Sequence, residues 1–155
     1  MGWKLAQERV FNYQPGLGSV GAYQASGKPW VTSYTAVATV ASAGDATEIL
    51  FPSVTRWIAI SMEDATAESA LRIGFSRHGV ESLLSQTNYY LLWNSQGLGA
   101  AAQGAAQTVT FEVKCNAIYI AGHANVIDNV SVMAGLTSIS NGEIITNWSG
   151  SVGVG

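Results

Sequence analysis

The sequence predicts an all-β fold: a single jelly-roll-like β-sandwich of about eight antiparallel strands that follows an extended N-terminal arm. Apolar residues recur at every second position in several short segments, which is the period of a half-buried β-strand. Seventeen glycines break up the chain, and no segment shows the apolar period of an amphipathic helix. Immunoglobulin-like sandwiches share this pattern, but the single cysteine leaves no Cys…Trp…Cys framework for that type.

The chain is expected to divide into an extended arm, residues 1–28, and one β-sandwich domain, residues 29–155. The arm places aromatic residues among glycines and prolines, so it is too interrupted for a long helix and too aromatic for a disordered tail. We expect it to become ordered by lying either against its own sandwich or against a neighbouring subunit.

Residues 51–80 form the predicted centre of the sandwich. Two alternating runs lie there, and the short acidic segment between them, residues 63–68, predicts that they pair as an antiparallel hairpin. We interpret the acidic segment as the solvated tip of this hairpin, with calcium binding as the alternative. One face of the two runs carries Val54, Ile58, Ile60, Met62, Leu71, Ile73 and Phe75, and the opposite face carries Trp57, Arg72 and Ser76.

The other strands are predicted from β-branched and aromatic runs. They are expected at residues 30–40, 47–51, 88–93, 108–114, 116–121, 126–136 and 143–148. The runs 108–114 and 116–121 are close enough to form one long bent strand with a bulge near Cys115. Residues 80–87 leave room for one helical turn, and residues 95–107, rich in Gly, Ala, Ser and Gln, predict an irregular loop.

The composition predicts assembly. Charged residues make up 11% of the chain, against a usual share of about a quarter, while 48% of residues are hydrophobic. We therefore expect part of the surface to be buried against copies of this chain or another protein. The net charge is −3 and the basic residues are scattered, which argues against nucleic acid as a partner. No apolar stretch approaches the ~20 residues of a membrane span, so a membrane partner is not expected either.

We expect no catalytic residue, cofactor or metal, and therefore no enzyme activity. His78 and His123 stand apart from any cysteine or carboxylate cluster, so neither fits a zinc site or a catalytic triad. The glycines of GLGSVG at 16–21 lack the preceding strand and following helix of a nucleotide-binding loop. Cys115 lies in an alternating run and is expected to be a buried, inert thiol.

A series of motifs resembles a known class of proteins. In order, these are GLGSVGAYQASGKPW, FPSVTRWIAI, LRIGFSRHGV, NYYLLW, VKCNAIYIAG, VMAGLTSI and GSVGVG. Together they resemble the small jelly-roll virion proteins of tailed phages and large aquatic DNA viruses, which decorate, cement or cap a capsid. The resemblance implies a virion structural protein without a cofactor. It would be made in the host cell cytoplasm, located in the capsid and bound to the major capsid protein or another virion protein.

The surface residues expected to serve this assembly are aromatic or basic. The candidate interface residues are Trp3, Tyr13, Tyr23, Trp30, Arg56, Arg72, Arg77 and His78. Arg56 is expected at the rim of the sandwich or paired with a carboxylate, and the other two arginines on an outward or intersubunit face. A homo-oligomer is predicted, with a trimer favoured. The alternative function is a carbohydrate-binding or receptor-binding module of a virion appendage, because exposed aromatic side chains could stack on a glycan.

Overall fold

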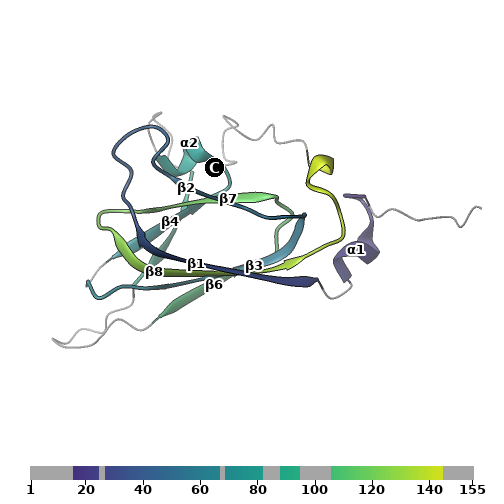
Figure 1. Ribbon diagram of the computed structural model, residues 1–155, viewed down its shortest axis with the longest axis horizontal. Helices are drawn as coiled ribbons and strands as arrows, with labels where there is room; N and C mark the ends of the chain where they lie inside the picture. Colours follow the sequence, from purple (N-terminus) through teal and green to yellow (C-terminus); the bar gives the residue numbers. More distant parts are fainter. Residues whose placement is uncertain (1–15, 25–26, 67–68, 82–87, 95–105, 145–155) are drawn as a thin grey trace, which may run out of the picture.

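The computed structural model describes residues 16–24, 27–66, 69–81, 88–94 and 106–144. Its strands are β1 (Lys28–Val37), β2 (Thr47–Leu50), β3 (Thr55–Glu63), β4 (Ala70–Gly74), β5 (Tyr90–Trp93), β6 (Gln107–Phe111), β7 (Ala117–Gly122) and β8 (Ile127–Leu136). The short helices are α1 (Val20–Gln24), α2 (Arg77–Glu81) and the 3₁₀ turn η1 (Asn141–Glu143). The strands form two packed four-stranded sheets (Figure 1). The predicted all-β sandwich of about eight antiparallel strands is confirmed.

The two sheets have a nested strand order. Sheet A runs β1-β8-β3-β6 and sheet B runs β2-β7-β4-β5. The antiparallel pairs therefore include β1 with β8, β2 with β7, β3 with β6 and β4 with β5. The jelly-roll topology expected from the sequence remains a prediction. Among the described strands, β4 and β5 alone are both consecutive in the chain and neighbours in a sheet.

The core lies between the sheets and is built from alternate residues of both. The largest fully buried side chains are Phe51, Ile49, Ile58, Ile60, Met62, Leu71, Ile73, Ile118, Ile120, Ile127, Ile139 and Val54. Burial of each such side chain stabilises the fold by roughly 1.5–3 kcal/mol. Trp30 joins this core, because its ring meets Phe51 edge-on at a centroid distance of 5.0 Å.

The hairpin predicted for residues 51–80 is wrong. Its first run is β3 in sheet A and its second is β4 in sheet B, so the segment between them crosses from one sheet to the other. Within the acidic segment Glu63 is exposed, but Asp64 is only 1% exposed and is not part of a solvated tip. The Asp64 carboxylate accepts hydrogen bonds from Thr66 N (2.6 Å), Ser69 Oγ (3.1 Å) and Asp128 N (3.2 Å). Both oxygens of Asp64 thus accept hydrogen bonds from protein donors.

Two further strand predictions differ from the structure. The runs 108–114 and 116–121 are not one bent strand, because β6 belongs to sheet A and β7 to sheet B. Thr55 fixes the crossing between them: its hydroxyl donates to Val113 O (2.7 Å) and accepts from Cys115 N (3.1 Å). In the predicted strand 143–148, Glu143 belongs to η1, and residues 145–148 lie outside the described part of the chain.

The described part of the arm lies at one end of its own sandwich (Figure 1). Residues 20–24 form α1 instead of an extended segment. Lys114 holds it, since Nζ donates to Leu17 O (3.2 Å) and lies 3.9 Å from the centre of the Tyr23 ring. Arg56 Nη1 donates to Gln24 O (3.4 Å). The division of the chain at residue 28 remains a prediction.

Candidate functional site

The outer face of sheet A is almost free of charge. The burial alternation of each strand and the pairing register define the outward positions. They are Pro29, Val31, Ser33 and Thr35 on β1; Asn129, Ser131, Met133 and Gly135 on β8; Trp57, Ala59, Ser61 and Glu63 on β3; and Thr108 and Thr110 on β6. Glu63, at one corner, is the charged exception within the strands, and the exposed Glu112 follows β6 at the edge of the sheet. We call the remaining residues the uncharged face.

One row of the uncharged face is apolar. Val31 pairs with Met133, and Met133 pairs with Ala59, so the three lie side by side across β1, β8 and β3. Val31 is 65% exposed and Met133 48% exposed. Large apolar side chains exposed next to one another are typical of a surface that another molecule covers.

The neighbouring row consists of hydroxyl groups. Ser33, Ser131, Ser61 and Thr108 follow one another across all four strands of sheet A. Ser61 Oγ and Thr108 Oγ1 are hydrogen-bonded at 2.6 Å, and the two Oγ atoms of Ser33 and Ser131 are 3.5 Å apart. These hydroxyls already have partners within the sheet, so covering them costs less than covering unpaired polar groups.

A glycine allows the third row to lie close to the sheet. Gly135 pairs with Trp57, and a Cβ at position 135 would overlap the indole atoms of Trp57. The Trp57 ring therefore lies directly against the backbone of Gly135. At this end of the uncharged face the ring does not project far from the sheet.

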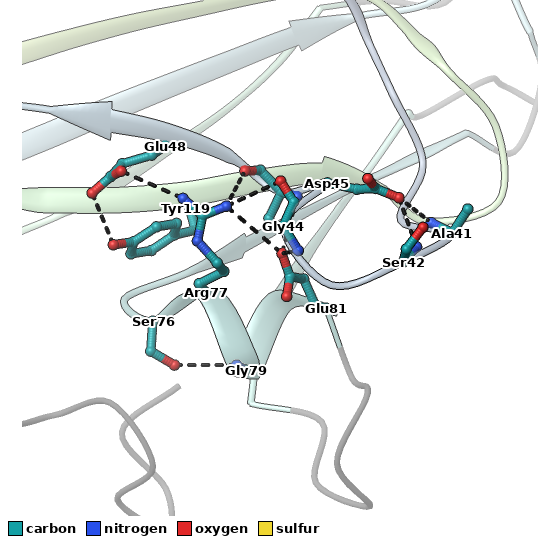
Figure 2. Close-up of polar contacts among 11 residues, drawn as sticks. Ala41, Ser42, Gly44, Asp45, Glu48, Ser76, Arg77, Gly79, Glu81 and Tyr119 are labelled. Atoms are coloured by element: carbon teal, nitrogen blue, oxygen red, sulfur yellow. Dashed lines mark hydrogen bonds and ion pairs between the residues drawn. The ribbon is translucent and has the colours of Figure 1, made fainter.

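The outer face of sheet B is charged and covered. Helix α2 and the loop between β1 and β2 lie over it, and Arg77 of α2 joins them (Figures 1 and 2). Arg77 Nη1 donates to Gly44 O (3.1 Å), Nη2 lies 3.5 Å from Glu48 Oε2, and the guanidinium lies over the Tyr119 ring at 5.4 Å. Arg77 therefore lies on this outer face in contact with its own subunit, and an intersubunit role for it remains a prediction.

Glu81 of α2 binds the same loop through a buried side chain. Its side chain is 1% exposed, and Oε1 accepts hydrogen bonds from Gly44 N (2.8 Å) and Ala46 N (3.2 Å), as Figure 2 shows for Gly44. Asp45 closes the same loop, because Oδ2 accepts from Ala41 N (2.9 Å) and Ser42 N (2.6 Å). These backbone donors lower the pKa of Asp45 below its usual value.

Arg72 also binds within its own subunit. From β4, its Nε donates to His123 Nδ1 (3.1 Å), Nη1 to Val80 O (3.1 Å) and Nη2 to His123 O (3.3 Å). The guanidinium carbon lies 4.8 Å from the centre of the Tyr89 ring. Arg72 points outward from sheet B, as expected, and ties α2 to the loop after β7; an intersubunit role for it remains a prediction.

The other candidate interface residues lie apart from one another. His78 is exposed on α2, Tyr23 and Arg56 lie at the arm, and Trp30 packs into the core. Trp3 and Tyr13 fall outside the described residues. The structure therefore does not gather the predicted residues into one surface. The uncharged face was missed because an uncharged strand position carries no motif, although alternate positions without charge on four strands were a usable signal.

Groups that could support chemistry are few in the described part of the chain. No set of three His, Cys, Asp or Glu side chains gathers there in a geometry that could hold a metal ion. Cys115 is 3% exposed, and burial raises the pKa of its thiol to about 11. The same residues contain no helix with the length and apolarity needed to cross a membrane.

Comparisons with known proteins give no family. No protein-family model matches the chain, and no curated protein matches it. Among solved structures, it is similar to a protein from Bacillus endospore appendages, described as a novel family of disulfide-linked pili. The two are 16% identical, with a TM-score of 0.35, over 71% of this chain and 87% of that chain. Such a likeness is too low to bear on function.

Proposed function

We propose that this protein is a virion structural protein: a capsid-associated β-sandwich of the decoration or cement kind that stabilises the particle by self-association and by binding the capsid shell. The observation that carries the proposal is the uncharged face. The virion as the site of action is proposed from the resemblance of the sequence motifs to small jelly-roll virion proteins.

The charge distribution supports self-association through this face. Two copies of a surface without charges do not repel each other and strip no charged group of water when they meet. The charged side chains of the sheet B face, by contrast, are engaged within their own subunit. The partner that the uncharged face fits best is therefore a second flat, uncharged surface, such as another copy of this chain.

The area of the uncharged face predicts that one contact between two copies of the chain is weak. Strands about 4.8 Å apart and a rise of about 3.3 Å per residue give a plan area of about 440 Å² for four strands over residues 29–35. Two such faces cover about 900 Å², close to the lower limit of about 1,000 Å² for a specific interface. Stable assembly would then depend on several contacts per subunit, which a closed oligomer on a symmetric shell provides.

Light scattering coupled to size-exclusion chromatography, over a wide range of protein concentrations, tests self-association. We expect the mean mass to rise with concentration, and Val31→Lys combined with Met133→Lys to hold the protein at the monomer mass. Leu50→Lys is the matched control, because Leu50 is 62% exposed on the outer face of sheet B. Equal association of the double variant and the wild type would refute the role of the face.

The measured mass also distinguishes the forms of assembly. Face-to-face contact between two copies gives a two-fold dimer, whereas the trimer favoured by the sequence requires the uncharged face to meet a different surface of the next copy. The virion assignment has its own test, immunogold labelling of virus particles from cells that carry the gene. Labelled particle surfaces are expected, and unlabelled particles would contradict the assignment.

A further inference from the structure

On the outer face of sheet B, beyond the cover formed by α2, three aromatic rings form a strip. Trp93 of β5 pairs with Ala70 of β4, and His123 N donates to Ala70 O (2.8 Å), so the two rings come together at a centroid distance of 6.1 Å. Tyr89 lies on the other side of His123, also at 6.1 Å. We call Tyr89, His123 and Trp93 the aromatic strip.

The outermost ring of the strip is open to solvent. Trp93 is 51% exposed, whereas Tyr89 and His123 are half-buried. A large exposed ring beside two half-buried rings gives an apolar surface on which a flat ligand can rest. Arg72 fixes the inner end, since its guanidinium lies over Tyr89 while its N–H groups bind His123 and Val80 O.

The hydrogen bond from Arg72 also fixes the proton of His123. An arginine nitrogen is only a donor, so Nδ1 of His123 must accept and carries no proton. The proton of the neutral imidazole is then on Nε2. Within the described residues, no hydrogen bond from Nε2 is found, which leaves this N–H available to a ligand. The strip therefore combines an exposed aromatic ring with one preset hydrogen-bond donor.

We propose that the aromatic strip is a carbohydrate-binding site that holds a neutral sugar, with the pyranose ring against Trp93 and a hydroxyl oxygen accepting from His123 Nε2. A pyranose presents an apolar C–H face and peripheral hydroxyls, and the C–H groups are attracted to the electron-rich face of an indole. The site lies on the sheet opposite to the uncharged face, so substitutions at Val31 and Met133 do not alter it.

Other ligand classes fit the strip less well. A nucleobase also stacks on aromatic rings, but nucleic-acid binding requires cations to follow the phosphates, and the chain has a net charge of −3. An anionic ligand would need a free positive charge, whereas the Arg72 guanidinium is already engaged by two carbonyl oxygens and an imidazole. A neutral sugar needs neither.

A printed array of bacterial, algal and animal oligosaccharides tests the proposal, followed by titration calorimetry with the oligosaccharide that gives the strongest signal. We expect at least one oligosaccharide to bind the wild type. Trp93→Ala should weaken its affinity at least about tenfold, in line with other rings stacked on an aromatic side chain, while Trp93→Phe should retain part of it.

Two further variants separate the parts of the site. His123→Asn keeps an acceptor for Arg72 but removes the Nε2 donor, and should also weaken binding. Tyr90→Ala is the matched control, because Tyr90 lies on the same strand with 49% exposure but packs towards Phe111 at the sandwich edge. Its affinity should equal that of the wild type. Thermal unfolding of each variant shows that the fold is intact.

The proposal is overturned by any of three results: no oligosaccharide on the array binds, Trp93→Ala binds as tightly as the wild type, or Trp93→Ala changes the oligomeric mass and leaves glycan binding intact. The third result would identify the strip as a protein interface. Because self-association is measured separately with the Val31 and Met133 variants, failure of one proposal does not imply failure of the other.

Discussion

The two outer faces of the sandwich carry opposite kinds of surface. On sheet B, Arg77, Glu81 and Arg72 bind backbone groups of α2 and nearby loops, so charge is used to attach a cover to the sheet. On sheet A, Val31, Met133 and the row of hydroxyls have no such cover among the described residues. Charged side chains thus complete the fold on the outer face of sheet B, whereas the described part of the outer face of sheet A stays uncovered.

The largest expected effect comes from breaking the cover of sheet B. Glu81→Ala leaves two backbone N–H groups, of Gly44 and Ala46, without their acceptor, and we expect a loss of about 2–4 kcal/mol in the free energy of unfolding. Urea denaturation measures it. Glu63→Ala is the control, because Glu63 is exposed at the corner of sheet A and should change stability by less than about 0.5 kcal/mol. Equal losses in the free energy of unfolding for the two variants would show that charge is no more important to stability on sheet B than on sheet A.

A smaller loss of stability is expected from disturbing the contact between Gly135 and Trp57 on the outer face of sheet A. Gly135→Ala places a methyl group against the Trp57 ring, which must shift, at a cost of about 1–3 kcal/mol in the free energy of unfolding. Gly21→Ala in α1 is the control, since a Cβ there meets no atom within 4 Å. Thermal unfolding compares them. A neutral result for Gly135→Ala would show that the ring is not seated on the glycine.

Charge on the uncharged face should leave the monomer's stability almost unchanged. Val31→Lys puts the ammonium group into solvent, and we expect a change in the free energy of unfolding within about 0.5 kcal/mol when urea denaturation is carried out at concentrations where the protein is monomeric. The same variant is expected to weaken association. A large loss of monomer stability would instead mean that Val31 packs within its own subunit.

The smallest effect should come from Asp45 in the loop that α2 covers. Because the pKa of Asp45 is lowered in the folded protein, its carboxylate stabilises the fold at a pH above its ordinary pKa of 3.8, and this stabilisation is lost as the pH falls through the lowered value. Asp45→Asn should therefore be slightly less stable than the wild type near neutral pH and equally stable in strong acid. Urea denaturation at several pH values measures the difference. A difference that does not change with pH would exclude the charge as its cause.

The fold class, most strand positions and the inward side chains could be predicted from the sequence. An alternating strand shows which of its faces is buried wherever it pairs, so Ile58, Ile60, Leu71 and Ile73 were placed correctly in the core. Low charge was likewise visible in the composition, and it predicted a surface for assembly without indicating where that surface lies.

Strand partners and the use of each charge were decided by tertiary structure. β3 and β4 are neighbours in the chain, yet the pattern of each is equally satisfied in either sheet, and long-range pairing with β8 and β7 separated them. That separation buried Asp64 and directed Arg72 and Arg77 towards their own subunit. Periodicity is a local property that fixes orientation, whereas pairing depends on residues far apart in the sequence, so only the folded sandwich could show that its uncharged side chains gather on one face.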